Sequence, residues 1–184
     1  MSIRMATVAD VPQILEIYAP YILETAISFE YTVPTREEFT QRFLTITAQF
    51  PWLVWEEAGK ILGYAYGSAP FERAAYGWCS EASIYLRPES HRKGIGKKLY
   101  QALEQLLAQQ GYKKVYAIIT TANQPSLTFH EAVGYRHTAT MPGCGYKFGT
   151  WYGTVWMEKD LAQWAAPEKP PVSSHDVPQL PKYF

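Results

Sequence analysis

The stretch from Glu81 to Gly111 constrains the fold most, because it combines a strand, a glycine-containing loop and a long helix. Its first six residues alternate polar and apolar side chains and include β-branched and aromatic residues, a pattern typical of a strand. Pro88 ends this strand, and Gly94 and Gly96 follow in the loop. Apolar residues at helical spacing then continue to the terminating glycine. The pattern predicts a layered α/β domain organised around this strand and helix.

The loop between this strand and helix has the character of a phosphate site. A helix N-terminus carries unpaired N–H groups and a partial positive charge. Gly94 and Gly96 keep side chains away, so phosphate oxygens could reach those N–H groups. Basic residues surround the loop: Arg92, Lys93, Lys97 and Lys98. The spacing is neither that of the Walker loop nor that of the dinucleotide fingerprint, and the alternative is that the glycines only turn the chain.

Composition limits the class of protein. A chain of 184 residues that is 47% hydrophobic and 18% charged fits one folded domain. The formal net charge of zero disfavours nucleic acid as a partner. No apolar run is long enough to span a membrane, and the first residues lack the apolar segment of a signal peptide, so we expect a cytoplasmic protein. The two cysteines and four histidines show no metal-binding spacing, so we expect no metal.

The remaining residues predict a mixed order of elements. Strand and helix patterns follow one another as strand, two helices, three strands, helix, strand, helix and two strands. Thr35 and Glu38 form a capping box at the start of the second helix, and Pro20 predicts a kink or break near the end of the first. Residues 162–184 contain five prolines and no periodicity. We therefore expect a domain over 1–161 and an extended, proline-rich C-terminal tail.

Several sequence blocks, in the right order, resemble those of one enzyme family. Besides the glycine loop, they are Arg-Ala-Ala-Tyr-Gly-Trp at 73–78 with Glu81, Asn123, Phe-His-Glu-Ala-Val-Gly-Tyr at 129–135, and Gly-Tyr-Lys-Phe-Gly-Thr-Trp at 145–151. Residues 2–160 thereby resemble the GNAT superfamily of N-acetyltransferases, in its phosphinothricin N-acetyltransferase-like branch. The resemblance implies the GNAT acyl-CoA N-acyltransferase fold: an α/β domain of three layers, with a central mixed, mostly antiparallel sheet flanked by helices.

The resemblance also implies an activity and a cosubstrate. The enzyme would move an acetyl group from acetyl-CoA to the amine of a small amino acid or analogue, such as phosphinothricin, methionine sulfone or methionine sulfoximine, by direct attack in a ternary complex. Acetyl-CoA would lie between the strands expected at 81–86 and 114–121. The first strand would pair with the pantetheine amides like an added strand, and the loop amides would hold the pyrophosphate.

The residues that would bind the cosubstrate follow from this placement. They are Ser83, Ile84, Tyr85, Leu86, His91, Arg92, Lys93, Gly94, Ile95, Gly96, Asn123 and Ser126. Asn123 would hydrogen-bond the pantetheine arm beyond the end of the second strand. His91 departs from the family pattern, which usually begins the loop with Gln or Arg.

Two residues are candidates for proton transfer. An alkylammonium with a pKa of about 10 is not a nucleophile, so a base must take its proton. Glu81, at the start of the central strand, is our candidate base; the alternative is a solvated carboxylate or one paired with Arg73. His130 lies seven residues after Asn123, where many relatives have a tyrosine that acts as general acid. Its alternative is a histidine that only packs. The oxyanion donor would be the backbone N–H of Ile84 or Tyr85.

A further group of residues would bind the amine substrate: Phe29, Glu30, Arg73, Tyr76, Trp78, Lys147 and Trp156. Arg73 could bind a tetrahedral acceptor oxygen or a carboxylate with two hydrogen bonds. For the aromatic residues the alternative is core packing. Lys147 could contact substrate across the interface of a homodimer, which the family and the aromatic content favour; its alternative is solvent exposure.

Other functions remain open at this level. The enzyme could instead acetylate a protein N-terminus or a polyamine, although a protein substrate needs an open groove. A non-catalytic CoA-binding module would keep the loop and lose the base, and a structural interaction domain would need neither. The presence of both Glu81 and His130 favours an enzyme.

Overall fold

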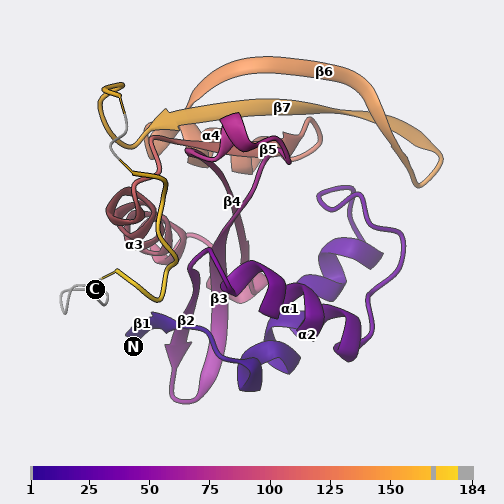
Figure 1. Ribbon diagram of the computed structural model, residues 1–184. Coiled ribbons are helices and arrows are strands. Elements are labelled where there is room, and N and C mark those ends of the chain that lie inside the picture. The colour runs from indigo at the N-terminus through magenta and orange to yellow at the C-terminus, as the bar shows by residue number, and fades with distance from the viewer. Residues whose placement is uncertain (1, 167–168, 178–184) are drawn as a thin grey trace.

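The computed structural model describes residues 2–166 and 169–177 and arranges them around one seven-stranded sheet (Figure 1). The sheet order is β1-β2-β3-β4-β5-β7-β6, and only β4 and β5 pair in parallel. The strands are β1 Ser2–Met5, β2 Trp52–Glu57, β3 Lys60–Ser68, β4 Cys79–Leu86, β5 Lys114–Thr120, β6 Arg136–Lys147 and β7 Thr150–Asp160. The helices are α1 Val11–Leu23, α2 Arg36–Thr47, α3 Ile95–Gln110 and α4 Gln124–Ala132. The predicted element order and the mixed, mostly antiparallel sheet are confirmed.

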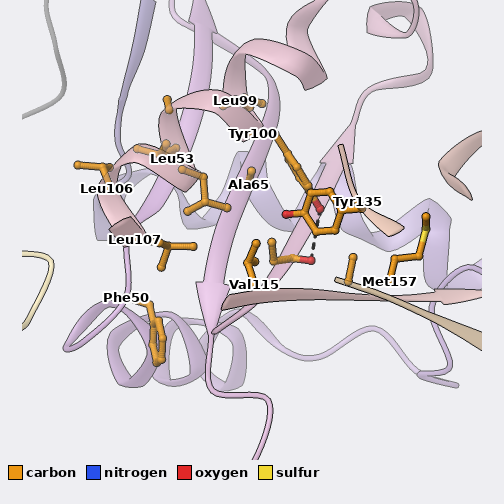
Figure 2. Close-up of a cluster of buried hydrophobic side chains, with 14 of the residues drawn as sticks. Phe50, Leu53, Ala65, Leu99, Tyr100, Leu106, Leu107, Val115, Tyr135 and Met157 are labelled. Carbon is orange, nitrogen blue, oxygen red and sulfur yellow. Dashed lines mark hydrogen bonds between the residues drawn. The ribbon is translucent and has the colours of Figure 1, made fainter. Parts of the chain in front are cut away.

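Helices cover both faces of the sheet because alternate side chains of each strand point to opposite faces. On β2, Leu53 and Trp55 belong to the hydrophobic cluster beneath α3, whereas Trp52 and Val54 belong to the cluster beneath α1 and α2. Figure 2 shows the cluster beneath α3, where Leu106 and its neighbours pack against the sheet. The layered architecture therefore follows from strands that are apolar on both faces.

The ends of α1 and α2 test two local predictions. The capping box is confirmed: the Glu38 main-chain N–H donates to the Thr35 Oγ1 at 3.2 Å, and the Thr35 N–H donates to the Glu38 carboxylate at 2.8 Å. Pro20 lies inside α1 and does not break it, because the helix continues to Leu23. Packing of the apolar face of α1 against the sheet keeps the helix intact past the proline.

The parallel pair at the centre of the sheet comes apart along its length. β4 and β5 pair only from Cys79 with Lys114 to Glu81 with Tyr116. Beyond this point, 82–86 pair only with β3 and 117–120 pair only with β7. Both strands continue with their facing edges unpaired. Because unpaired main-chain edges can accept a further extended chain, this opening is the natural place for a ligand.

The hairpin of β6 and β7 forms a long arm that arches along one side of the molecule (Figure 1). Its end reaches the α1–α2 loop, residues 24–35, where the Tyr31 hydroxyl donates to the main-chain oxygen of Tyr146. Large apolar side chains are exposed on the arm: Met141, Tyr146, Phe148 and Trp151. The end of the arm thus contacts the α1–α2 loop.

Part of the C-terminal segment expected to be a tail is attached to the domain. The Val172 N–H donates to the Gln110 main-chain oxygen at 2.9 Å, and the Ser174 N–H donates to the Gln49 main-chain oxygen at 3.0 Å. These bonds satisfy carbonyls at or just beyond the C-termini of α3 and α2. Residues 167–168 and 178–184 of the expected tail lie outside the described residues. The domain boundary at 161 stays a prediction.

Within 2–166 and 169–177, no helix has the length and apolar character needed to cross a bilayer.

Candidate active site

A cavity of about 60 Å³ lies where β4 and β5 separate. Both strands, α3, α4 and the α1–α2 loop contribute its walls: Ile27, Ala82, Ser83, Ile84, Tyr85, Tyr100, Ala117, Ile118, Ile119, Thr120, Asn123, Ser126 and His130. Six of the residues predicted from the sequence therefore meet here: Ser83, Ile84, Tyr85, Asn123, Ser126 and His130. The sequence did not indicate Ile27 or Tyr100, whose apolar positions are those of ordinary core residues.

The predicted phosphate loop lies beyond the end of β4, at the start of α3. Residues 91–94 are exposed, and Gly94 occupies the N-cap position with no side-chain cap. Within the described chain, the N–H groups of Arg92, Lys93 and Gly94 donate to no protein acceptor. Together with the first N–H groups of α3 they form a set of free donors at the positive end of a helix, the arrangement that binds phosphate oxygens.

The two glycines of this loop have different structural roles. Gly94 has φ +78°, a left-handed conformation that favours glycine, and a Cβ there would meet nothing within 4 Å. A Cβ at Gly96 would instead meet Ile84 and Phe129 at 3.4 Å. Gly94 therefore shapes the loop on its open side, whereas Gly96 lets α3 approach β4 and α4. The sequence predicted only that both glycines keep side chains away from the loop.

Glu81 lies at the last paired position of β4 and β5, where the strands begin to separate. Desolvation by burial raises the pKa of its carboxyl to about 7. The structure shows no hydrogen bond or ion pair between Glu81 and Arg73 within the described residues. At neutral pH an appreciable fraction of this carboxylate is therefore ionised yet still basic, as a general base requires.

His130 and Tyr100 form a buried pair at the cavity wall. The His130 Nδ1 lies 2.7 Å from the main-chain oxygen of Ser126, which can only accept, so Nδ1 carries the proton. The other ring nitrogen, Nε2, then accepts from the Tyr100 hydroxyl at 2.8 Å. Burial lowers the pKa of His130 to about 4 and holds the pKa of Tyr100 well above its usual value. Both side chains are neutral at pH 7.

The amide of Asn123 is partly committed to local structure. Its Oδ1 accepts from the Ser126 N–H at 3.2 Å and so caps α4. Among the described residues, its NH₂ group has no protein acceptor. Asn123 therefore has a free donor beside the cavity, and the cap fixes its direction.

At the end of β4, Leu86 lies outside the cavity lining, and its main-chain oxygen accepts from the Tyr21 hydroxyl at 2.6 Å. His91 also contacts this tyrosine, with its Nε2 3.3 Å from the hydroxyl oxygen. Arg92 is exposed and has φ +60°, so it shares the left-handed conformation of Gly94. Leu86, His91 and Arg92 thus connect the open edge of β4 to the phosphate loop.

The predicted substrate residues fall into two groups. Phe71, which was not predicted, joins Tyr76 and Trp156 in one aromatic cluster, with ring centroids 4.5 Å and 5.9 Å from its own. Trp78 has a buried indole N–H without an acceptor in the described chain, and Arg73 is exposed on the same loop. Apart from Trp156, which lies on β7, this group lies in the loop before β4, close to Glu81 in the sequence.

The second group lies on the α1–α2 loop and at the end of β6. The Phe29 ring packs over Gly145 of the β6–β7 arm, where an added Cβ would come within 2.3 Å of it. Glu30 accepts from Arg42 at 2.7 Å, a partner that the sequence did not indicate. Lys147 is only 2% exposed, and its Nζ donates to main-chain oxygens of the loop region. The lysine is thus neither in solvent nor free to reach across an interface.

The arrangement fits the shape of an acyl-CoA. It offers an open strand edge for a linear amide chain, free N–H groups for phosphates and a basic carboxylate at the opposite end of β4. No cluster of three metal-ligating side chains occurs among the residues that the structure describes.

Comparisons with known proteins identify the family. The model of the acetyltransferase (GNAT) domain matches residues 3–156. The phosphinothricin N-acetyltransferase of Streptomyces viridochromogenes is 34% identical over 170 residues, which are 92% of this chain and 92% of that protein. The L-methionine sulfoximine/L-methionine sulfone acetyltransferase of Pseudomonas aeruginosa is 36% identical over 87% of this chain and 94% of its own length.

A solved structure agrees with these sequence relatives. The GNAT superfamily phosphinothricin acetyltransferase from Sinorhizobium meliloti, in complex with AcCoA, superimposes with a TM-score of 0.87. The two proteins are 36% identical, and the match covers 91% of this chain and 93% of that one. The chain therefore belongs to the GNAT family of acetyltransferases and is an acetyl-CoA-dependent N-acetyltransferase.

Proposed function

We propose that this enzyme transfers the acetyl group of acetyl-CoA to the amine of a free amino acid or analogue that carries a tetrahedral phosphinate, sulfone or sulfoximine group. The observation that carries the proposal is Glu81, a basic carboxylate at the mouth of the β4–β5 opening. Relatives that match most of the chain include a phosphinothricin N-acetyltransferase and an L-methionine sulfoximine/L-methionine sulfone acetyltransferase, which supports this substrate class. Arg73, exposed on the adjacent loop, supplies a cation for the tetrahedral group or the carboxylate.

The chain's own groups would hold acetyl-CoA along β4. The open edge at Ser83–Tyr85 would pair with the pantetheine amides, and the free NH₂ of Asn123 would donate to the same arm. The N–H groups of 92–96 would hold the pyrophosphate, helped by the positive charges of Arg92 and Lys93. Because the strand leads from this loop back to Glu81, the thioester would lie beside the carboxylate.

Proton transfer would begin at Glu81. Its carboxylate would take a proton from the substrate ammonium, directly or through water, and the freed amine would attack the thioester carbon. A C–N bond forms, and the oxyanion would be stabilised by a main-chain N–H of Ile84 or Tyr85. The C–S bond then breaks and the CoA sulfur leaves with the electron pair. The nitrogen loses its second proton to the leaving thiolate or to solvent, since Glu81 already holds the first.

His130 would act through Tyr100 rather than as an imidazolium acid. With a pKa of about 4, His130 carries no ionisable proton on Nε2 at neutral pH. It accepts from the Tyr100 hydroxyl and so fixes that side chain at the cavity wall. We assign it the role of holding the tyrosine beside the leaving sulfur.

We also propose a cytoplasmic homodimer. The exposed apolar side chains of the β6–β7 arm, among them Trp151 at 66% exposure, form the surface that a second copy would cover. Cys79 and Cys144 are free thiols, as a reducing compartment maintains them. Light scattering would return twice the 21.0 kDa chain mass, and the mass of one chain would contradict the dimer.

A thiol-release assay tests the activity. The wild-type enzyme would be screened with acetyl-CoA against free amino acids, methionine sulfone, methionine sulfoximine, phosphinothricin and N-terminal peptides. We expect release with the analogues and a kcat/KM that rises with pH through about 7, as Glu81 loses its proton. Glu81→Gln should lower kcat/KM by about 100-fold or more and remove this rise. Activity on peptides alone would contradict the proposed substrate class.

A further inference from the structure

Lys147 is a buried cation that the proposed chemistry does not use. It is the last residue of β6 and is 2% exposed. Its Nζ donates to the main-chain oxygens of Ile22 and Ser28, each at 2.6 Å. Burying an ammonium is costly, and two short charge-assisted hydrogen bonds offset that cost only if the geometry is fixed. A cation held in this way ties the end of α1 and the α1–α2 loop to the arm, which is remote from both in the sequence.

The two acceptors bracket a residue of the cavity wall. Ile22 lies in the last turn of α1, and Ser28 lies six residues later in the α1–α2 loop. Between them is Ile27, which lines the cavity between β4 and β5. Lys147 therefore holds the chain on both sides of Ile27 at once.

Further contacts connect this segment to the arm and to β4. On the arm side, the Tyr31 hydroxyl donates to the main-chain oxygen of Tyr146. On the β4 side, the Ser28 Oγ lies 2.9 Å from the Tyr18 hydroxyl, and the Tyr18 ring packs edge-on against Tyr85 at 4.8 Å. Tyr85 also lines the cavity. The α1–α2 loop is thus fixed between the arm and the reactive strand, with Lys147 at the junction.

We propose that Lys147 is a positioning residue that holds the α1–α2 loop as one wall of the reaction cavity, without touching the substrate. The expected effect on kcat/KM rests on the proposed function. The expected effect on the order of the α1–α2 loop does not depend on that function. The sequence predicted a substrate contact for Lys147, but two of its three ammonium hydrogens are held by main-chain oxygens and the side chain is 2% exposed. Loss of the ammonium would leave both carbonyls unpaired and free the segment between them.

The test combines amide hydrogen exchange with kinetics. Lys147→Met keeps an unbranched chain of similar length and removes the donor. We expect exchange of the main-chain amides of 24–31 to increase about tenfold or more in the free protein. We also expect kcat/KM for the amine to fall about tenfold or more, because the wall is displaced. The Kd for CoA, held mainly by the loop at 91–96, should change by less than about threefold.

A matched control separates positioning from general destabilisation. Leu106→Ala removes a buried side chain of α3 that lies in the cluster on the opposite face. It should lower stability without a selective increase of exchange at 24–31 and without changing the KM for the amine. If Lys147→Met fails to fold, Tyr31→Phe removes another bond of the same junction at an exposed side chain and should act in the same direction.

The outcomes distinguish the two proposals. Unchanged exchange at 24–31 in Lys147→Met, or an increase no more local than that of Leu106→Ala, would overturn the positioning role. When Lys147→Met does not fold, unchanged exchange and kinetics in Tyr31→Phe would overturn it. If the wild-type enzyme released no thiol with any amino acid, the proposed substrate class would fail, while the exchange data would still decide the role of Lys147.

Discussion

Glu81 owes its chemistry to its place on β4. The carboxylate lies where two strands separate, and burial alone raises its pKa to about 7. A lysine or arginine partner would hold the carboxylate ionised and make it a weaker base. Among the described residues it has no such partner. The sequence could place this glutamate at the start of a strand, but the desolvation depends on packing that no local pattern encodes.

The raised pKa of Glu81 predicts a cost in stability with a definite pH dependence. Between pH 4.5 and about 7 the folded state binds more protons than the unfolded state, so stability falls as pH rises through this window. The cost is fully present above pH 7, and one pKa unit corresponds to about 1.4 kcal/mol. Glu81→Gln should therefore gain about 2 kcal/mol relative to wild type between pH 5 and pH 8. Urea unfolding at both pH values measures this, and an equal difference at pH 5 and pH 8 would contradict it.

His130 should contribute through Tyr100, and a double-mutant cycle tests this. We expect His130→Ala and Tyr100→Phe each to lower kcat about tenfold, because each removes one member of a hydrogen-bonded pair. The double variant should lose little more than either single variant. An unchanged kcat of His130→Ala at saturating substrates would remove the histidine from the mechanism, and additive losses would show that the two residues act separately.

At the scale of elements, the loop before α3 and the separation of β4 from β5 together form the site expected for acetyl-CoA. Beyond Glu81, β4 pairs on one edge only, and α3 begins without a side-chain cap. Each feature alone would leave main-chain groups unsatisfied. The glycine loop predicted this site from sequence, because glycines just before a helix leave its first N–H groups open to phosphate oxygens. The short length of the parallel pairing was not predictable, since strand patterns do not specify where two neighbours diverge.

Gly94 offers a direct test of the loop. Gly94→Ala should lower the free energy of unfolding by about 1 kcal/mol, because alanine is strained at φ +78°. It should also weaken CoA binding, measured by calorimetry, because the new methyl group lies on the open side of the loop. Gly59→Ala is the matched control: Gly59 also has φ +78° with nothing within 4 Å, but it lies in the β2–β3 turn. Equal CoA affinities of the two variants would contradict a role for the loop.

At the scale of the whole molecule, contacts between distant segments complete the domain. The order of the elements followed from periodicity, glycines and prolines, which act locally. Three contacts did not follow from such local signals: the junction at Lys147, the pair of Tyr100 with His130, and the attachment of 171–174 to α3. Each joins residues that are remote in sequence, and the signals that mark them are an ordinary lysine, an apolar helix position and a proline-rich stretch.

The attachment of the C-terminal segment predicts a purely structural effect. Gln110 is 2% exposed, and its Nε2 donates to the main-chain oxygens of Gln49 and Val172 at 2.7 Å and 2.8 Å. Gln110→Ala should lower the free energy of unfolding by about 1 kcal/mol, because two hydrogen bonds are lost while each acceptor keeps a second donor, the Ser174 N–H or the Gln49 side chain. The exposed neighbour Gln109→Ala should have little effect. Neither variant should change kcat or KM, and altered kinetics in Gln110→Ala alone would show that the segment also shapes the active site.

The most direct test of the central claim is a crystal structure of the wild-type enzyme with acetyl-CoA. We predict the pyrophosphate on the main-chain N–H groups of 92–96, the pantetheine arm between β4 and β5, and the thioester carbon close enough to Glu81 for one substrate amine to lie between them. A cosubstrate bound elsewhere, or a thioester at the far end of the cavity from Glu81, would contradict the account.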